Sequence, residues 1–280
     1  MAALGTQLTA IVTPFSEDGS VDEDAYVRVL QHVCAHGSDG VVVCGTTGEA
    51  STLDDAEHLR VIELTTQEIP TGKTVIAGTG SNDTRHAAYM TEEATKLGVD
   101  GILSVTPYYN RPDPRGIVAH YEVVAKATDK PVLLYNIPAR TALDIPNELL
   151  ARLAQIEHIE GVKQANDDNL AMIDGLDLYA GNDTTYARVL DMGGAGGILV
   201  ASHVFGDEMR RIVDEPDARA EVDAALQDAY AATGYHGPIS IKKACELAGL
   251  CSARMRLPML EADDERTEII RAAMTNHGLL

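Results

Sequence analysis

The sequence predicts an α/β fold, a closed (β/α)8 TIM barrel with a C-terminal helical appendage. Eight short runs rich in Val, Ile and Leu follow one another between about residues 7 and 200. They show little polar alternation, as expected of parallel strands buried on both faces. Segments with helical periodicity separate these runs, and a chain of 280 residues is long enough for such a barrel with further helices.

The predicted strands and helices alternate along the chain. The strands are Leu8–Val12, Gly40–Cys44, Thr74–Ala77, Gly101–Val105, Val132–Tyr135, Ile159–Lys163, Leu178–Ala180 and Gly197–Val200. The helical patterns between them include Asp22–Ala35, Ala56–Glu68, Thr84–Leu97, Gly116–Ala127 and Thr184–Met192. After these come three helical segments without strands, at Glu215–Thr233, Ile239–Leu247 and Asp264–Thr275. We therefore expect a barrel domain over residues 1–214 and a C-terminal helical domain over residues 215–280.

An open doubly wound sheet is the alternative that the same alternation allows. Its dinucleotide-binding form needs a GxGxxG motif after the first strand, and Gly78-Thr79-Gly80 lacks the third glycine. Gly72-Lys73-Thr74 resembles the end of a P-loop, but Gln67 stands where the first glycine is needed and the segment runs into a strand. The closed barrel is therefore the better prediction.

Composition and charge exclude several classes of protein. The chain has 43 acidic and 22 basic residues, a net charge of −21, which repels nucleic acid and anionic membranes. No run approaches the ~18 apolar residues of a membrane span, and the first five residues lack the pattern of a signal peptide, so we expect a cytoplasmic protein. Its four cysteines and nine histidines form no metal-binding motif, so we expect reduced thiols and no metal.

The active site of such a barrel lies at the carboxyl ends of its strands. The second strand ends in Gly45-Thr46-Thr47-Gly48-Glu49, where glycines permit a tight turn with exposed N–H groups. This turn could hold a carboxylate or simply join strand to helix. The sixth strand ends at Lys163, where burial would favour the neutral amine that Schiff-base chemistry needs. A lysine that reaches solvent at the rim is the alternative.

Aromatic and basic residues end two more strands. Tyr108 and Tyr109 follow the fourth strand, and Tyr135 closes the fifth. A tyrosine at a strand end can transfer protons, although packing also explains such rings. Arg140, which follows Tyr135 closely, offers a planar fork for a carboxylate, with a surface ion pair as the alternative.

Four of these motifs occur in order: Gly45-Thr46-Thr47-Gly48-Glu49, Pro107-Tyr108-Tyr109, Tyr135-Asn136-Ile137-Pro138 with Arg140-Thr141, and Gly161-Val162-Lys163. Together they closely resemble the dihydrodipicolinate synthase family of the N-acetylneuraminate lyase superfamily, over essentially the whole barrel. The resemblance implies a class I lyase that condenses pyruvate with L-aspartate 4-semialdehyde in the diaminopimelate route to lysine. It also implies a homotetramer built from tight dimers and no organic cofactor.

The resemblance further implies a role for each site residue. Lys163 would form the imine with pyruvate, and a relay of hydroxyl groups would move the protons. The relay would comprise Tyr135, Thr47 and Tyr109, with Tyr109 reaching in from a neighbouring subunit. The substrate-binding positions would be the Thr46–Thr47 backbone for the pyruvate carboxylate, Arg140 for the carboxylate of the semialdehyde, and Gly181 and the Ile198 backbone beside the imine.

The chain departs from the family pattern where lysine-sensitive relatives bind lysine as a feedback inhibitor. Asn82, Tyr108 and His58 fit those relatives. His86, however, stands where they carry an acid for the lysine ammonium, and Asp55 stands where they carry a histidine. We therefore expect weak or absent feedback inhibition.

Two other functions compete with the synthase. A sister aldolase for a sugar acid, such as N-acetylneuraminate or 2-keto-3-deoxygluconate, would use the same lysine, although a polyol aldehyde would not need the Arg140 guanidinium. A catalytically idle barrel with a binding role would keep the fold and lose a relay residue. All the relay positions are filled in this chain, which disfavours that reading.

Overall fold

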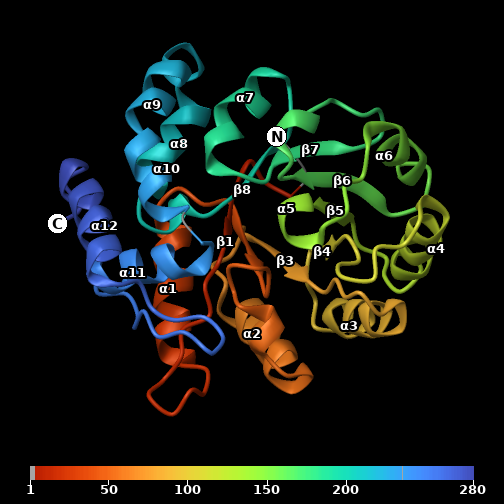
Figure 1. Ribbon diagram of the computed structural model, residues 1–280, viewed down its shortest axis with the longest axis horizontal. Coiled ribbons are helices and arrows are strands. Elements are labelled where there is room, and N and C mark those ends of the chain that lie inside the picture. Colours follow the sequence, from red (N-terminus) through yellow and green to blue (C-terminus); the bar gives the residue numbers. More distant parts are fainter. Residues whose placement is uncertain (1–3, 235) are drawn as a thin grey trace.

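A computed structural model describes residues 4–234 and 236–280 of the chain. Parallel strands pair in chain order, and the first also pairs with the last, so the sheet closes into a barrel (Figure 1). The strands are β1 (Gln7–Ala10), β2 (Gly40–Val43), β3 (Thr74–Gly78), β4 (Gly101–Val105), β5 (Val132–Asn136), β6 (Ile159–Gln164), β7 (Asp177–Ala180) and β8 (Gly196–Leu199). The predicted closed barrel is confirmed, because every strand pairs on both sides, whereas an open sheet has two edge strands that each pair on one side only.

Helices connect the strands and cover the outside of the barrel (Figure 1). They are α1 (Glu23–Ala35), α2 (Asp55–Glu68), α3 (Thr84–Lys96), α4 (Pro114–Ala125), α5 (Pro138–Thr141), α6 (Asn147–Leu153), α7 (Tyr186–Asp191) and α8 (Gly206–Asp214). Asp22, Asp54, Asp83 and Asp113 cap the first four, each accepting a hydrogen bond from a backbone N–H of the first turn. Part of the acidic excess therefore stabilises helix starts, typically by ~1 kcal/mol each.

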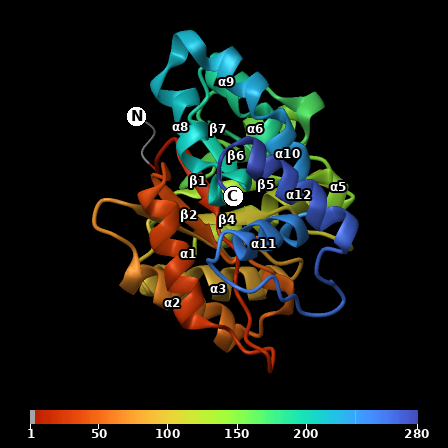
Figure 2. The same ribbon diagram turned by 90° about the vertical axis from the view of Figure 1, so that its left-hand side faces the viewer.

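The C-terminal tail adds α9 (Arg219–Ala225), α10 (Gln227–Thr233), α11 (Pro238–Leu247) and α12 (Asp264–Asn276). Figures 1 and 2 show this tail on one side of the barrel, beside α1 and α8. Its apolar residues share one hydrophobic cluster with the outer layer of the barrel; they include Val222, Leu226, Ile241, Ile270 and Met274. The predicted appendage is confirmed as C-terminal helices, and the division into two domains at residue 214 stays a prediction.

Some predicted elements differ from those of the structure. The predicted helix Glu215–Thr233 is interrupted, because Pro216 begins a 3-10 helix and Leu226, at φ −90° and ψ 0°, separates α9 from α10. The predicted helix Thr184–Met192 begins as a 3-10 turn before α7. Helices α5, α6 and α8, of 4, 7 and 9 residues, are not among the helical segments named from the sequence, because such short segments give little periodic signal.

The inside of the barrel is filled by its own apolar layer. This layer comprises Leu4, Leu8, Ala10, Val42, Ile76, Leu103, Leu133, Tyr135, Ile137, Tyr179 and Ile198. Tyr135 and Ile198, two predicted site residues, belong to it, so the rim of the barrel rests directly on a close-packed core. No helix in the described part of the chain is long and apolar enough to cross a membrane.

Candidate active site

The predicted site residues converge on one rim of the barrel. Thr46 and Thr47 follow β2, Tyr109 follows β4, and Gly181 follows β7. Tyr135, Lys163 and Ile198 lie near the carboxyl ends of β5, β6 and β8. Because all the strands are parallel, these ends meet at the same face of the sheet.

A cavity of about 520 Å³ opens at this rim. Thr46, Tyr135 and Arg140 are the predicted site residues that line it, and Gly45, Glu49 and Tyr108 line it as well. Thr47, Tyr109, Lys163, Gly181 and Ile198 are not among its lining residues. The structure therefore brings the turn, the Tyr135 phenol and the Arg140 guanidinium to one space within a single chain.

The Lys163 amine lies over the face of the Tyr135 ring. The two residues are in register on β6 and β5, and the Lys163 Nζ is 4.4 Å from the ring centroid. Only 5% of Lys163 is exposed, and no ion pair in residues 4–234 and 236–280 includes it. This is the environment that a Schiff-base lysine requires.

Asp183 is a buried carboxylate that interacts with the charge of Lys163, and it is not among the site residues predicted from the sequence. Its carboxylate accepts hydrogen bonds from the backbone N–H groups of Val200, at 2.9 Å, and Ala201, at 3.2 Å. Burial raises the pKa of Asp183, and the two backbone N–H groups and the Lys163 charge act against that shift. Its place two residues after Gly181, just beyond a strand end, was the signal available in the sequence.

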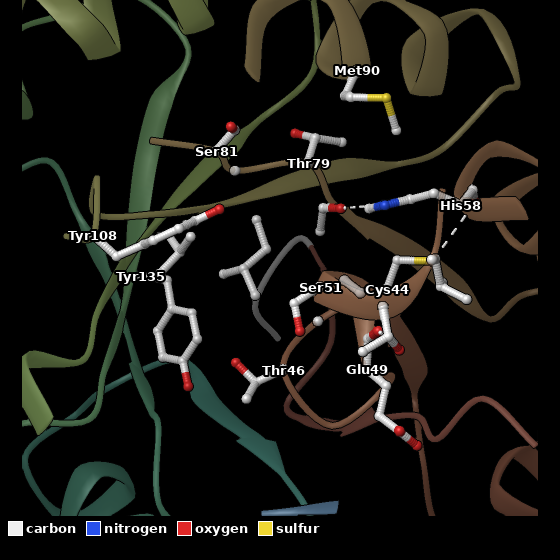
Figure 3. Close-up of a pocket in the computed structure, with 18 of the residues that line it drawn as sticks. Cys44, Thr46, Glu49, Ser51, His58, Thr79, Ser81, Met90, Tyr108 and Tyr135 are labelled. Atoms are coloured by element: carbon white, nitrogen blue, oxygen red, sulfur yellow. Dashed lines mark hydrogen bonds between the residues drawn. The ribbon is translucent and has the colours of Figure 1, made fainter. Parts of the chain in front are cut away.

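The turn after β2 presents the Thr46 hydroxyl and the backbone N–H groups of Thr46 and Thr47. Cys44 and Glu49 both have φ +54°, in the left-handed region, so the turn is sharply bent at both ends. In Figure 3 the Thr46 hydroxyl points toward the phenol of Tyr135 across the cavity. Thr47 is instead buried, at 6% exposure. In the described residues, the N–H groups of Thr46 and Thr47 have no acceptor, so they are available to an anion.

Arg140 lies at the end of α5, exposed at the edge of the cavity. A Cβ added to Gly237, at the start of α11, would stand 2.7 Å from the Arg140 Nη2, so the guanidinium lies against the backbone there. No acid pairs with Arg140 in the described part of the chain, which disfavours the surface ion pair considered above. The guanidinium is therefore free to bind a carboxylate.

Tyr109 does not line the cavity of its own chain. It is 89% exposed and has φ +70°, a costly backbone conformation for a bulky side chain. The next residue, Asn110, anchors the loop by donating to Tyr108 and Asn82 carbonyls, at 2.8 and 2.9 Å. One chain alone therefore does not bring Tyr109 to Tyr135.

Four of the positions predicted to decide lysine sensitivity line the same cavity, and Asn82 does not. Asp55, His58, His86 and Tyr108 are all part of its wall. His86 Nε2 and Asp55 Oδ1 are 2.9 Å apart, and His58 Nε2 lies 2.8 Å from the Gly78 carbonyl (Figure 3). The exchanged acid and histidine thus pair with each other. No group of three or more His, Cys, Asp or Glu in the described residues is arranged to hold a metal.

Comparisons with known proteins identify the family of this chain. The model of the dihydrodipicolinate synthetase family matches residues 3–277. The 4-hydroxy-tetrahydrodipicolinate synthase of Symbiobacterium thermophilum is 38% identical, with 100% of both chains covered.

The structure of the chloride inhibited dihydrodipicolinate synthase from Acinetobacter baumannii, complexed with pyruvate, has a TM-score of 0.95 and 32% identity, covering 99% of this chain and 100% of that one. The structure of the Cyanidioschyzon merolae enzyme with lysine bound has a TM-score of 0.95 and 34% identity, covering 100% of both. By sequence and fold over its whole length, this chain belongs to the dihydrodipicolinate synthetase family.

Proposed function

We propose that this chain condenses pyruvate with L-aspartate 4-semialdehyde through an imine on Lys163. The observation that carries the proposal is the enclosed Lys163 amine, 4.4 Å from the Tyr135 ring centroid, at the end of a barrel strand. The Acinetobacter baumannii relative is described as complexed with pyruvate, which supports this first substrate. The product would feed the diaminopimelate route to lysine.

The reaction follows from the amine chemistry. The neutral Lys163 Nζ attacks the ketone carbon of pyruvate, loss of water leaves an imine, and the imine nitrogen takes up a proton from the relay. Because that imine withdraws electrons, the methyl group loses a proton and an enamine forms. The enamine carbon attacks the aldehyde of the second substrate, whose oxygen takes up a proton. The amine of that substrate then attacks the imine carbon, closes the ring and releases Lys163.

Local positive groups would hold the anionic substrates in this acidic protein. The N–H groups of Thr46 and Thr47 would bind the pyruvate carboxylate, as backbone donors do in other anion sites. Arg140 would bind the carboxylate of the semialdehyde. Gly181 and Ile198 would shape the wall beside the imine, since a Cβ on Gly181 would stand 2.7 Å from the Ala165 Cβ.

The proton relay needs one refinement. The threonine predicted for the relay is Thr47, which is buried at 6% exposure and outside the cavity lining. Thr46 lines the cavity and turns its hydroxyl toward Tyr135 (Figure 3). We therefore propose that Thr46 gives its hydroxyl to the relay and that Thr47 contributes its backbone N–H group.

Tyr109 would complete the relay from a second subunit. Its 89% exposure leaves the ring free to enter the site of a partner that packs on this face. The working unit is then at least a dimer, and the family resemblance favours a homotetramer of two such dimers. We also propose a cytoplasmic location, as expected for an enzyme of amino-acid biosynthesis.

The competing function is a sister aldolase that would join pyruvate to a sugar-type aldehyde. The test is a condensation assay in which purified protein and pyruvate receive L-aspartate 4-semialdehyde, N-acetylmannosamine or glyceraldehyde. We expect turnover with the semialdehyde and at least ~100-fold lower kcat/KM with the polyols, because only the semialdehyde offers a carboxylate to Arg140. Equal or better turnover of a polyol would contradict the proposal, and no turnover with any aldehyde would favour the idle barrel.

A further inference from the structure

Helix α11 reaches from the C-terminal tail to the turn Gly45–Glu49 and buries an ion pair against it. The Lys242 ammonium donates hydrogen bonds to the Glu49 carboxylate and, at 2.9 Å, to the Arg254 carbonyl. The exposed fraction is 0% for the Lys242 side chain and 1% for that of Glu49. Buried ion pairs add little net stability because desolvation offsets their attraction, but they fix geometry well when every partner is satisfied.

A second cation of the tail reinforces the same contact. The Arg256 guanidinium carbon and the Lys242 Nζ both lie over the Phe15 ring, at 4.4 and 4.1 Å from its centroid. The Arg256 backbone N–H donates to the Glu49 carboxylate at 3.3 Å, and its guanidinium donates to the Thr52 carbonyl at 2.6 Å. The C-terminal tail therefore contacts the turn at its last residue, Glu49, and contacts the chain again at Thr52.

Glu49 ends the turn in a strained backbone conformation. Glu49 has φ +54°, and its N–H donates to the Thr46 carbonyl at 3.1 Å. A residue in this conformation persists only where its surroundings hold it there. The available N–H groups of Thr46 and Thr47 lie within three residues of Glu49, so a change at Glu49 is transmitted directly to them.

The surroundings of Lys242 are those of a buried lysine paired with a carboxylate. Burial lowers the pKa of Lys242, and the adjacent Glu49 carboxylate acts against that shift. The Lys242 side chain is fully buried and paired with Glu49, so its charge is not offered to an anionic substrate. Of its partners, Glu49 is the one that belongs to the turn.

We propose that Glu49 and Lys242 are positioning residues through which the C-terminal tail sets the Thr46–Thr47 backbone to receive the pyruvate carboxylate. The proposal rests on the function given above, because it assigns that carboxylate to this turn. It gives the tail a part in substrate binding that the barrel alone cannot supply.

The test compares Lys242→Met, the double variant Glu49→Gln/Lys242→Met, and Lys243→Met as matched control. Lys243 is the next residue on α11 and pairs with Glu246 of the same helix, and neither residue lines the cavity. The measurements are the steady-state KM for each substrate, kcat, the melting temperature, and hydrogen exchange of the peptide covering residues 44–53.

We expect Lys242→Met to raise the KM for pyruvate about tenfold or more while the KM for the semialdehyde changes little, because only the pyruvate-binding turn is displaced. Exchange in residues 44–53 should become faster. The double variant should regain melting temperature, since no unpaired buried charge remains, yet keep the raised pyruvate KM. Lys243→Met should match the wild type in both.

Recovery of the pyruvate KM together with the melting temperature in the double variant would overturn the positioning role. An unchanged pyruvate KM and unchanged exchange in a folded Lys242→Met protein would overturn it as well. Failure of the proposed function looks different, because the wild type itself would then form no pyruvate adduct. In that case the exchange of residues 44–53 alone decides whether the tail holds the turn.

Discussion

At the scale of single residues, the site depends on which polar groups face the cavity. Lys163 and Tyr135 stand out in the sequence because each ends a predicted apolar strand, where a polar residue needs a reason, and the structure places both near the carboxyl ends of β6 and β5. For two neighbours within a turn it is harder to predict which side chain faces the cavity. Thr46 and Thr47 have the same side chain, and the side chains of a turn do not alternate between two faces as those of a strand do. The structure separates them by exposure, with Thr46 open to the cavity and Thr47 buried.

Substitution of the two threonines tests which hydroxyl serves the relay. We expect Thr46→Val to lower kcat by ~100-fold, the usual contribution of a positioned proton-transfer group, while the fold is kept. Thr47→Val should lower kcat much less, because it keeps the backbone N–H group. Steady-state kinetics of both purified variants give the comparison, and a larger loss in Thr47→Val would restore the original assignment.

The Asp55–His86 pair leads to a prediction about regulation. The exchange places a histidine where an incoming lysine ammonium would need an acid, and that histidine already pairs with Asp55 at 2.9 Å. We expect millimolar L-lysine to leave the activity nearly unchanged, and Asp55→His/His86→Glu to gain sensitivity. Initial rates against lysine concentration test this, and strong inhibition of the wild type would refute it.

At the scale of elements, His203 joins the two strands that close the barrel. It lies beyond β8, its Nε2 accepts from the Val12 N–H at 3.1 Å, and its Nδ1 donates to the Val200 carbonyl at 2.8 Å. These partners require the neutral ring, and burial lowers the pKa of His203 to about 4. The sequence offered no sign of this role, because the bond depends on strand ends far apart in the chain.

This histidine should make folding stability depend on pH. Between its folded pKa of about 4 and the ordinary value of 6.5, the unfolded chain binds the proton and the folded chain does not. The free energy of unfolding should therefore fall as the pH drops from 6.5 toward 4, with His203 contributing about 3 kcal/mol at most. Urea unfolding of the wild type and His203→Gln across this range measures it. An equally steep pH dependence in the variant would contradict the assignment.

At the scale of the whole molecule, the barrel and its helical tail were predictable, and the contacts between them were not. Alternating strands and helices leave few topologies, so the closed barrel follows from pattern alone. The ion pair of Glu49 with Lys242 joins segments 193 residues apart, and neither sequence pattern nor local propensity bears on it. The same limit applies to Tyr109, whose partner would be another chain.

Mixing two impaired variants tests whether Tyr109 acts across subunits. Tyr109→Phe should fold normally and lose at least ~10-fold in kcat, because a relay hydroxyl is missing. Unfolded and refolded together with Lys163→Ala, it should regain about a quarter of wild-type activity, since half of the dimers are hybrids with one complete site. Activity equal to the sum of the separate variants would place Tyr109 in the site of its own chain.

The most direct test of the central chemistry is borohydride reduction in the presence of pyruvate, followed by mass mapping of the peptides. We predict one stable pyruvate adduct on Lys163, and none on Lys163→Ala or in the absence of pyruvate. An adduct on a different lysine, or none on a folded wild-type protein, would contradict the account.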